Sequence, residues 1–144
     1  MFKVLTILIK SASHLPLETM SYGPLISEVI CKGLVFFNVV SIQARLTSRF
    51  TPAFSRNLEE KLPEHKRVLF SWVAVSDSGL RAFFVGLNVL LAVLLWVPSF
   101  RTLGLWVGFG LCFLGLYSDL QLKESFIPHT TLFFLCGGAL WLAE

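Results

Sequence analysis

Charged residues are scarce in this sequence. Only 15% of its 144 residues are Asp, Glu, Lys or Arg, whereas 55% are apolar. A soluble domain carries about 25% charged residues, which cover its surface in water. The mean hydropathy of +0.73 agrees with this deficit of charge. The composition therefore nearly excludes a soluble domain and predicts an integral membrane protein that crosses the bilayer several times.

Several signatures of known chemistry are also missing. The net charge is only +3 and no block of five like charges occurs, so nucleic acid is not an expected partner. The three cysteines, Cys31, Cys112 and Cys136, stand alone in apolar stretches without metal-ligand spacing, which predicts buried thiols and no metal site. Nucleotide-binding, zinc-protease and serine-hydrolase motifs are absent, and no pattern indicates a cofactor.

Long uncharged stretches dominate what remains. Residues 82–100, 102–118 and 125–143 carry no charge, and each is close to the roughly 20 residues that cross a bilayer. The stretch 25–44 is as long but contains Glu28 and Lys32, which can pair one helical turn apart. We predict an all-α protein, a polytopic membrane four-helix bundle. Its helices are expected at about 22–45, 70–98, 102–119 and 125–143 within a unit that spans 22–144.

Two segments lie outside these predicted helices. Residues 46–69 are rich in charge and contain two prolines, which is typical of an aqueous loop. Residues 1–21 begin with an apolar stretch that is too short to span, and we expect an uncleaved N-terminal segment that lies in the interface or packs on the bundle. Most Lys and Arg residues outside the helices lie on the side of 46–69. The positive-inside rule therefore places this loop in the cytoplasm, in an organelle that the sequence does not specify.

Glycines recur at helical spacing in two of the predicted helices. Gly104, Gly108 and Gly115 are separated by four and seven residues, and Gly79 and Gly86 by seven. Small residues at such steps let helix backbones approach closely in lipid. The pattern predicts tight packing between the helices of one chain, and it leaves dimerisation as an alternative.

The threading brings polar residues of four helices to the end of the bundle that adjoins 46–69. Asp77 and Arg81 can form an ion pair that either anchors their helix at the interface or makes the charged floor of a pocket. Asp119 and His129 can meet across a short turn and orient a general acid or base, or both can simply lie in water. The candidate catalytic residues are Asp119, His129, Asp77 and Arg81. The candidate ligand-binding residues are Asn38, Gln43 and Tyr117, of which Tyr117 is alternatively an interfacial aromatic residue.

Residues 79–141 resemble the small four-helix membrane proteins of the DoxX-like superfamily. The similarity lies in GLRAFFVGL, LGLWVGFGLCFLGLYSDL and the histidine of FIPHTTLFF. In that superfamily a Gly-x-Arg opens the second helix, an acid closes the third and a histidine opens the fourth. The resemblance therefore implies roles for Arg81, Gly86, Asp119 and His129. Relatives often carry an acid directly after the arginine, where this chain has Ala82, so an acidic partner for Arg81 must come from Asp77.

A second resemblance is to a family of four-span scaffold proteins of sterol biosynthesis, which tether membrane enzymes rather than catalyse. It rests on FFNVVSIQ in the first helix, the region from Trp72 to Arg81 and the triplet at 118–120. The two resemblances agree on architecture but not on role. Because every polar residue also has a structural explanation and no motif requires chemistry, we predict an accessory or scaffold for membrane-associated lipid or secondary-metabolite biosynthesis. Its expected partners are membrane lipids, membrane-bound biosynthetic enzymes or an apolar small molecule. The alternative is a cofactor-free membrane cyclase or isomerase that uses acid–base chemistry on an apolar metabolite, so the sequence leaves open whether the protein is an enzyme.

The predicted threading can be tested by labelling single cysteines introduced at Arg56 and at Gly23. If the first helix spans the membrane, a membrane-impermeant thiol reagent reaches the two positions from opposite sides. Labelling of both positions from the same side would contradict a first span and would separate the polar residues that the threading brings together.

Overall fold

The computed structural model describes residues 22–143, and these residues are almost entirely helical. The predicted N-terminal segment 1–21 lies outside the described residues. The elements, in chain order, are α2 (Gly23–Leu46), α3 (Pro52–Leu69), α4 (Asp77–Trp96), the short 3-10 helix η1 (Pro98–Phe100), α5 (Arg101–Leu122) and α6 (Ile127–Leu142). The predicted all-α class is confirmed.

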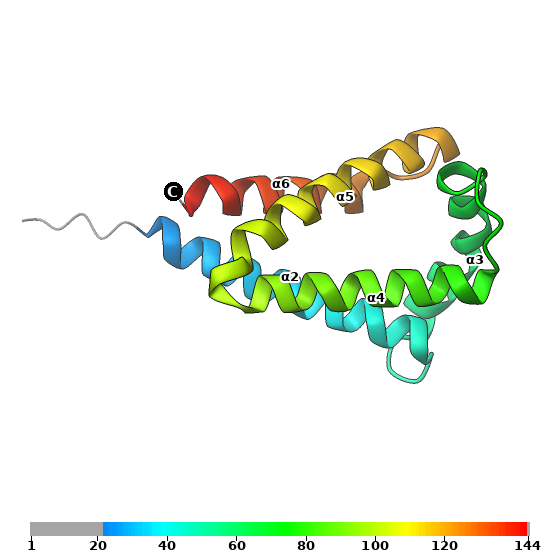
Figure 1. The fold of residues 1–144 in the computed structure, drawn as a ribbon, viewed down its shortest axis with the longest axis horizontal. Coiled ribbons are helices and arrows are strands. Elements are labelled where there is room, and N and C mark those ends of the chain that lie inside the picture. Colours follow the sequence, from blue (N-terminus) through cyan, green and yellow to red (C-terminus); the bar gives the residue numbers. More distant parts are fainter. Residues whose placement is uncertain (1–21, 144) are drawn as a thin grey trace, which may run out of the picture.

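The four apolar helices run alternately up and down and close into a ring (Figure 1). α2 packs against α4 and α6, and α5 packs against the same two helices from the other side. The end of α2, the start of α4, the end of α5 and the start of α6 therefore lie at one end of the molecule. The core joins all four apolar helices and consists of small and aliphatic side chains: Cys31, Leu34, Leu95, Leu105, Cys136 and Ala139.

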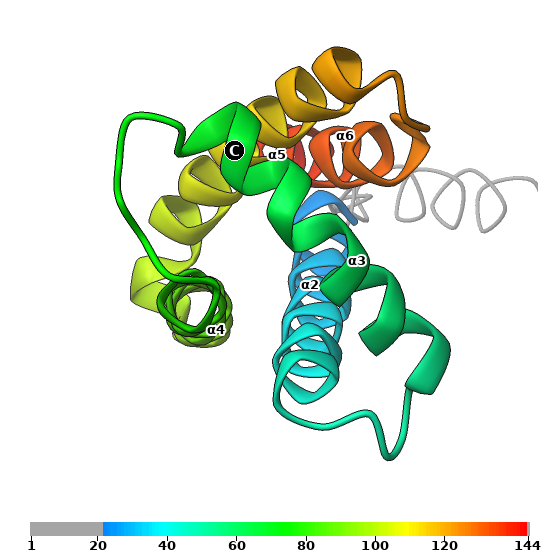
Figure 2. The ribbon, with the colours of Figure 1, turned by 90° about the vertical axis from the view of Figure 1, so that its right-hand side faces the viewer.

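The prediction of a loop at 46–69 is wrong, because most of this polar segment forms α3. Phe54, Leu58 and Leu62 recur every four residues and give this polar helix one apolar face, which explains why it folds despite Pro63. Figure 2 shows α3 lying across the end of the bundle, where it contacts α2, α4 and α5. The described chain thus has five α-helices, of which one is polar.

The start of α4 also differs from the prediction. We expected a helix from about residue 70, but residues 70–76 form a turn and α4 begins at Asp77. The side chain of Ser76 accepts a hydrogen bond from the backbone N–H of Gly79 at 3.1 Å, which caps the helix at this point. The apolar residues before it therefore connect α3 to α4 and do not lengthen α4.

Three helical segments are long and apolar enough to cross a membrane, namely α2, α4 and η1 together with α5. α6 is also apolar but has 16 residues, so it is shorter than the usual span. Large side chains such as Trp106, Phe113, Phe134 and Trp141 are exposed on the outer surface of these helices. Lipid is the surrounding that covers such a surface without cost, so the chain is a membrane protein.

Glycines permit close helix contacts on α5 but not on α4. A Cβ atom placed on Gly104 would lie 2.9 Å from Cβ of Leu94, so α5 approaches the α4 backbone at this glycine. The prediction of close packing is wrong for Gly86, where a Cβ atom would have nothing within 4 Å. Gly79 meets only the capping region of its own helix, at Ser76 and Val75. The three cysteines are buried as predicted.

The Gly104 contact can be tested by replacing this residue with Ala. The added methyl group would force α5 away from Leu94, and overpacking of this kind destabilises by about 1–3 kcal/mol. We expect a lower midpoint of thermal unfolding in detergent. Gly110→Ala is the matched control on the same helix, because a Cβ atom there meets nothing within 4 Å. An unchanged midpoint for Gly104→Ala would contradict the close approach of α4 and α5.

Candidate functional site

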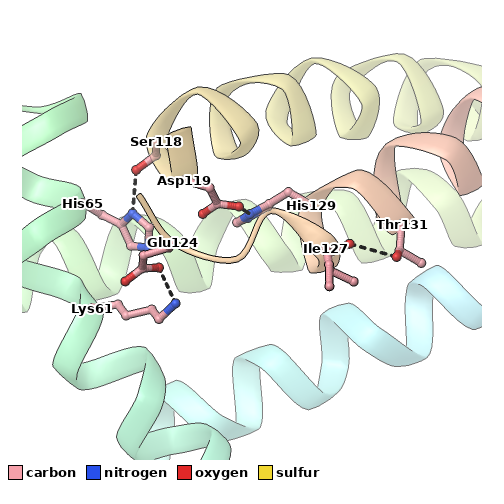
Figure 3. A network of polar contacts seen from close by, with 8 residues as sticks. All are labelled: Lys61, His65, Ser118, Asp119, Glu124, Ile127, His129 and Thr131. Carbon is pink, nitrogen blue, oxygen red and sulfur yellow. Dashed lines mark hydrogen bonds and ion pairs between the residues drawn. The ribbon is translucent and has the colours of Figure 1, made fainter. Parts of the chain in front are cut away.

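Asp119 and His129 form the predicted contact at the end of the bundle beneath α3. The carboxylate of Asp119 lies in the last turn of α5, and His129 lies in the first turn of α6. Nδ1 of His129 is 2.6 Å from Oδ2 of Asp119 (Figure 3). Asp119 is only 2% exposed, whereas about a third of the His129 side chain remains accessible. The pair thus joins a buried acid to a reachable imidazole.

The turn between the two helices brings these residues together. Lys123 adopts a left-handed conformation with φ of 55°, and the N–H of Glu124 donates to the backbone oxygen of Asp119 at 2.9 Å. These features end α5 and reverse the chain. Pro128 then occupies the first turn of α6, where its missing N–H has no helical partner to lose. His129 follows directly and faces the end of α5.

Gly115 provides the space in which the His129 ring lies. A Cβ atom on Gly115 would be 2.6 Å from Nε2 of His129, so the ring fills the volume that any larger residue would need. Gly115 precedes Asp119 by one helical turn, and both therefore lie on the same face of α5. The glycine and the acid together fix where the imidazole sits.

A second histidine reaches the same end of the bundle from α3, and the sequence analysis missed it. Nδ1 of His65 is 2.8 Å from Oγ of Ser118, the residue next to Asp119 (Figure 3). Lys61, one turn earlier on α3, forms an ion pair with Glu124 in the α5–α6 turn. Lys61 and His65 are four residues apart and lie next to the apolar face that Phe54, Leu58 and Leu62 form. This helical spacing is the signal that could have identified them. Our interpretation of 46–69 as a loop concealed it.

The surroundings of His65 favour its neutral form. Burial is the main cause, and it lowers the pKa of the imidazole below its ordinary value. Glu124 and Asp119 act in the opposite direction, while His129 and Lys61 add to the decrease. The net effect is a neutral imidazole near physiological pH.

Asp77 and Arg81 do not pair with each other, contrary to prediction. Oδ1 of Asp77 accepts from Nζ of Lys66 at 2.8 Å, and Arg81 lies 3.4 Å from a carboxylate oxygen of Glu59. Both partners belong to α3, so ion pairs between α3 and α4 take the place of the predicted pair within α4. These two exposed ion pairs tie α3 to α4 and form no charged floor of a pocket.

The three candidate ligand-binding residues make their contacts apart from the pair of Asp119 and His129, which we call the dyad. Nδ2 of Asn38 donates to the backbone oxygen of Leu34 within its own helix at 2.8 Å. Gln43 accepts from the hydroxyl of Thr51 at 2.8 Å and so links α2 to the start of α3. Tyr117 is half-exposed and borders an apolar surface hollow of about 330 Å³ together with Phe113, Leu116, Leu120 and Phe126.

Glu28 and Lys32 on α2 form the predicted ion pair one turn apart, at 2.9 Å. Within residues 22–143, no three His, Cys, Asp or Glu side chains cluster closely enough to hold a metal ion. The polar contacts under α3 are therefore the main concentration of chemistry-bearing side chains that the described part of the chain presents.

Two curated proteins are similar to this chain over most of its length. The cyclic ether formation enzyme xenC of Xenoacremonium sinensis is 49% identical over 116 residues, which cover 81% of this chain and 94% of xenC. The cyclic ether formation enzyme gkaZ of Penicillium citrinum is 46% identical over 104 residues, which cover 72% of this chain and 81% of gkaZ. No protein-family model and no solved structure matches the chain. The DoxX-like and scaffold-like resemblances therefore stay predictions.

The neutral state of His65 predicts a pH-dependent stability. Unfolding exposes the imidazole, which then binds a proton as the pH falls through about 6.5, while the folded protein binds it only at lower pH. The contribution of the neutral His65 to stability is thus fully present above about pH 6.5. It is lost as the pH falls from there through the lower pKa that His65 has in the folded protein. We expect the unfolding midpoint in detergent to decrease less for His65→Gln than for the wild type between about pH 7 and pH 5. Parallel curves for the two proteins would contradict a depressed pKa of His65.

Proposed function

We propose a catalytic function from one premise: the chain belongs to the family of the cyclic ether formation enzymes xenC and gkaZ. In this proposal the protein closes an ether ring within an apolar metabolite, at the end of the bundle that α3 covers. The observation that carries the proposal is the contact between His129 and the buried Asp119. Such a pair can remove a proton from a hydroxyl group.

The hydrogen bond assigns a role to each member of the pair. An ionised carboxylate only accepts, so Nδ1 of His129 donates to Asp119 and carries the ring proton. Nε2 is then left with a free lone pair. His129 is the general base of the proposed reaction, and Asp119 orients it and stabilises the imidazolium that forms.

Ring closure at this site balances without an oxidant or a reductant. His129 takes the proton of a substrate hydroxyl, and the oxygen forms a bond to an electrophilic carbon of the same molecule. The bond that breaks at this carbon leaves its electron pair on another oxygen, as in the opening of an epoxide. That oxygen takes up one proton while the imidazolium of His129 releases the proton it removed, so His129 is regenerated and the product is an isomer of the substrate.

The membrane setting suits such a substrate. An apolar metabolite partitions into lipid and can reach the bundle between helices whose outer surfaces are apolar. Because Asp119 is buried, its carboxylate lies in a medium of low dielectric constant, in which charge–dipole interactions are strong.

The catalytic interpretation replaces our preference for an accessory role. Both relatives are named as enzymes of cyclic ether formation, which favours the cyclase alternative. Asp77 and Arg81 leave the proposed catalytic set, because each is engaged with α3 in an ion pair at the protein surface. Of the candidate residues, Asp119 and His129 remain.

The function can be tested by producing this chain in a Penicillium citrinum strain that lacks gkaZ. We expect it to restore the cyclic ether product, measured by mass spectrometry of culture extracts, with reintroduced gkaZ as the positive control. In the same strain His129→Ala and Asp119→Asn should lower product formation at least about 100-fold, because a general base contributes that much. Their abundance in the membrane fraction should match the wild type.

Gly115→Ala provides a more subtle test of the same site. The new methyl group displaces the His129 ring from its place beside Asp119, and we expect product formation to fall about 10- to 100-fold. Gly110→Ala, on the same helix but next to open space, is the matched control. Full activity of His129→Ala and Asp119→Asn would refute the catalytic role of the dyad.

A further inference from the structure

We infer that His65 of α3 is a second catalytic residue: its neutral imidazole donates a hydrogen bond from Nε2 to the substrate oxygen that becomes negative when the ether ring closes. This inference rests on the proposed function. It assigns the other half of the reaction, since a base alone leaves the developing oxyanion without a donor. His65 lies at the same end of the bundle as the dyad and comes from a different helix.

The contact with Ser118 determines which ring nitrogen of His65 carries the proton. Ser118 is fully buried, and among the described residues the only side-chain hydrogen bond of its hydroxyl is the one to Nδ1 of His65. If Nδ1 carried the proton, the hydroxyl proton of Ser118 would be buried without an acceptor, which is unfavourable. Ser118 therefore donates to Nδ1, and the ring proton of His65 lies on Nε2.

Two consecutive residues of α5 thus fix opposite tautomers in two histidines. Ser118 donates to His65 and leaves Nε2 of that ring as a donor. Asp119 accepts from His129 and leaves Nε2 of the other ring as an acceptor. Ring closure needs one acceptor for the hydroxyl proton and one donor for the displaced oxygen. The two imidazoles supply one of each.

The electrostatic surroundings support a neutral donor at His65. Glu124 and Asp119 are the acidic groups that face it, and Lys61 and His129 are the basic ones. Lys61 already pairs with Glu124, which reduces the attraction of Glu124 for a proton on His65. Burial then lowers the pKa of His65 and keeps the ring uncharged.

Attachment of α3 does not account for His65. α3 is already held by three ion pairs, which join Lys61 to Glu124, Lys66 to Asp77 and Glu59 to Arg81. The contact of Nδ1 with Ser118 leaves the proton on Nε2, where a substrate oxygen can accept it. In the described residues Nε2 of His65 has no hydrogen-bond partner of its own.

The experiment compares His65→Gln with His65→Asn in the gkaZ-deficient strain. Gln places an amide N–H near the position of Nε2, whereas Asn can replace only the contact with Ser118. We expect His65→Gln to stay within about 10-fold of the wild type and His65→Asn to lose about 100- to 1,000-fold, the usual cost of removing an oxyanion donor. Glu64→Gln, at an exposed position of α3, should leave product formation unchanged.

The outcomes separate this inference from the proposed function. Equal activities of His65→Gln and His65→Asn, whether both high or both low, would overturn the donor role of His65. If His129→Ala and Asp119→Asn lose product while His65→Asn keeps it, only this inference fails. If the two dyad variants keep full activity, the proposed function fails as well. All variants are compared at equal abundance in the membrane fraction.

Discussion

The buried carboxylate of Asp119 needs a partner, and that requirement organises the end of the bundle where it lies. Asp119 is 2% exposed at the end of an apolar helix, where a charge without hydrogen bonds would be costly. His129 satisfies it from α6, in space that Gly115 leaves open. The left-handed residue Lys123 makes this geometry possible by reversing the chain within a few residues. Site and helix packing are thus parts of one arrangement.

α3 contributes both ion pairs and a histidine to this end of the bundle. Its charged residues form ion pairs with α4 and with the α5–α6 turn, at positions where water still reaches them. Such pairs contribute little stability individually, but three of them fix the orientation of the helix. Its inner face carries the buried Leu62 and brings His65 to the end of α5. A polar helix that lies across the apolar ones therefore adds an imidazole beside the buried Asp119.

Membership in the family of xenC and gkaZ changes how the polar residues are interpreted. Taken singly, most of them have a structural explanation, and an accessory role follows from that view. The enzyme names of xenC and gkaZ favour catalysis, and the contacts in the structure indicate which residues are free for it. Asn38 is bonded within its own helix, and Asp77 and Arg81 are occupied by α3. The two histidines keep an unoccupied ring nitrogen, which is what acid–base chemistry requires.

Sequence alone determined the features that depend on short separations along the chain. Charge-free stretches predicted apolar helices, and helical periodicity predicted the pair of Glu28 with Lys32. The pair of Asp119 with His129 was predictable because only a short turn separates them. Tertiary structure decided the contacts of α3, whose partners lie far away in sequence: His65 is 53 residues from Ser118, and Lys61 is 63 residues from Glu124. No local pattern specifies where a polar helix docks, because several acidic and basic residues could have satisfied its charges. The packing of the apolar helices placed Ser118 within reach of His65. It also placed Asp77 and Arg81 within reach of Lys66 and Glu59 on α3, so these two residues do not pair with each other.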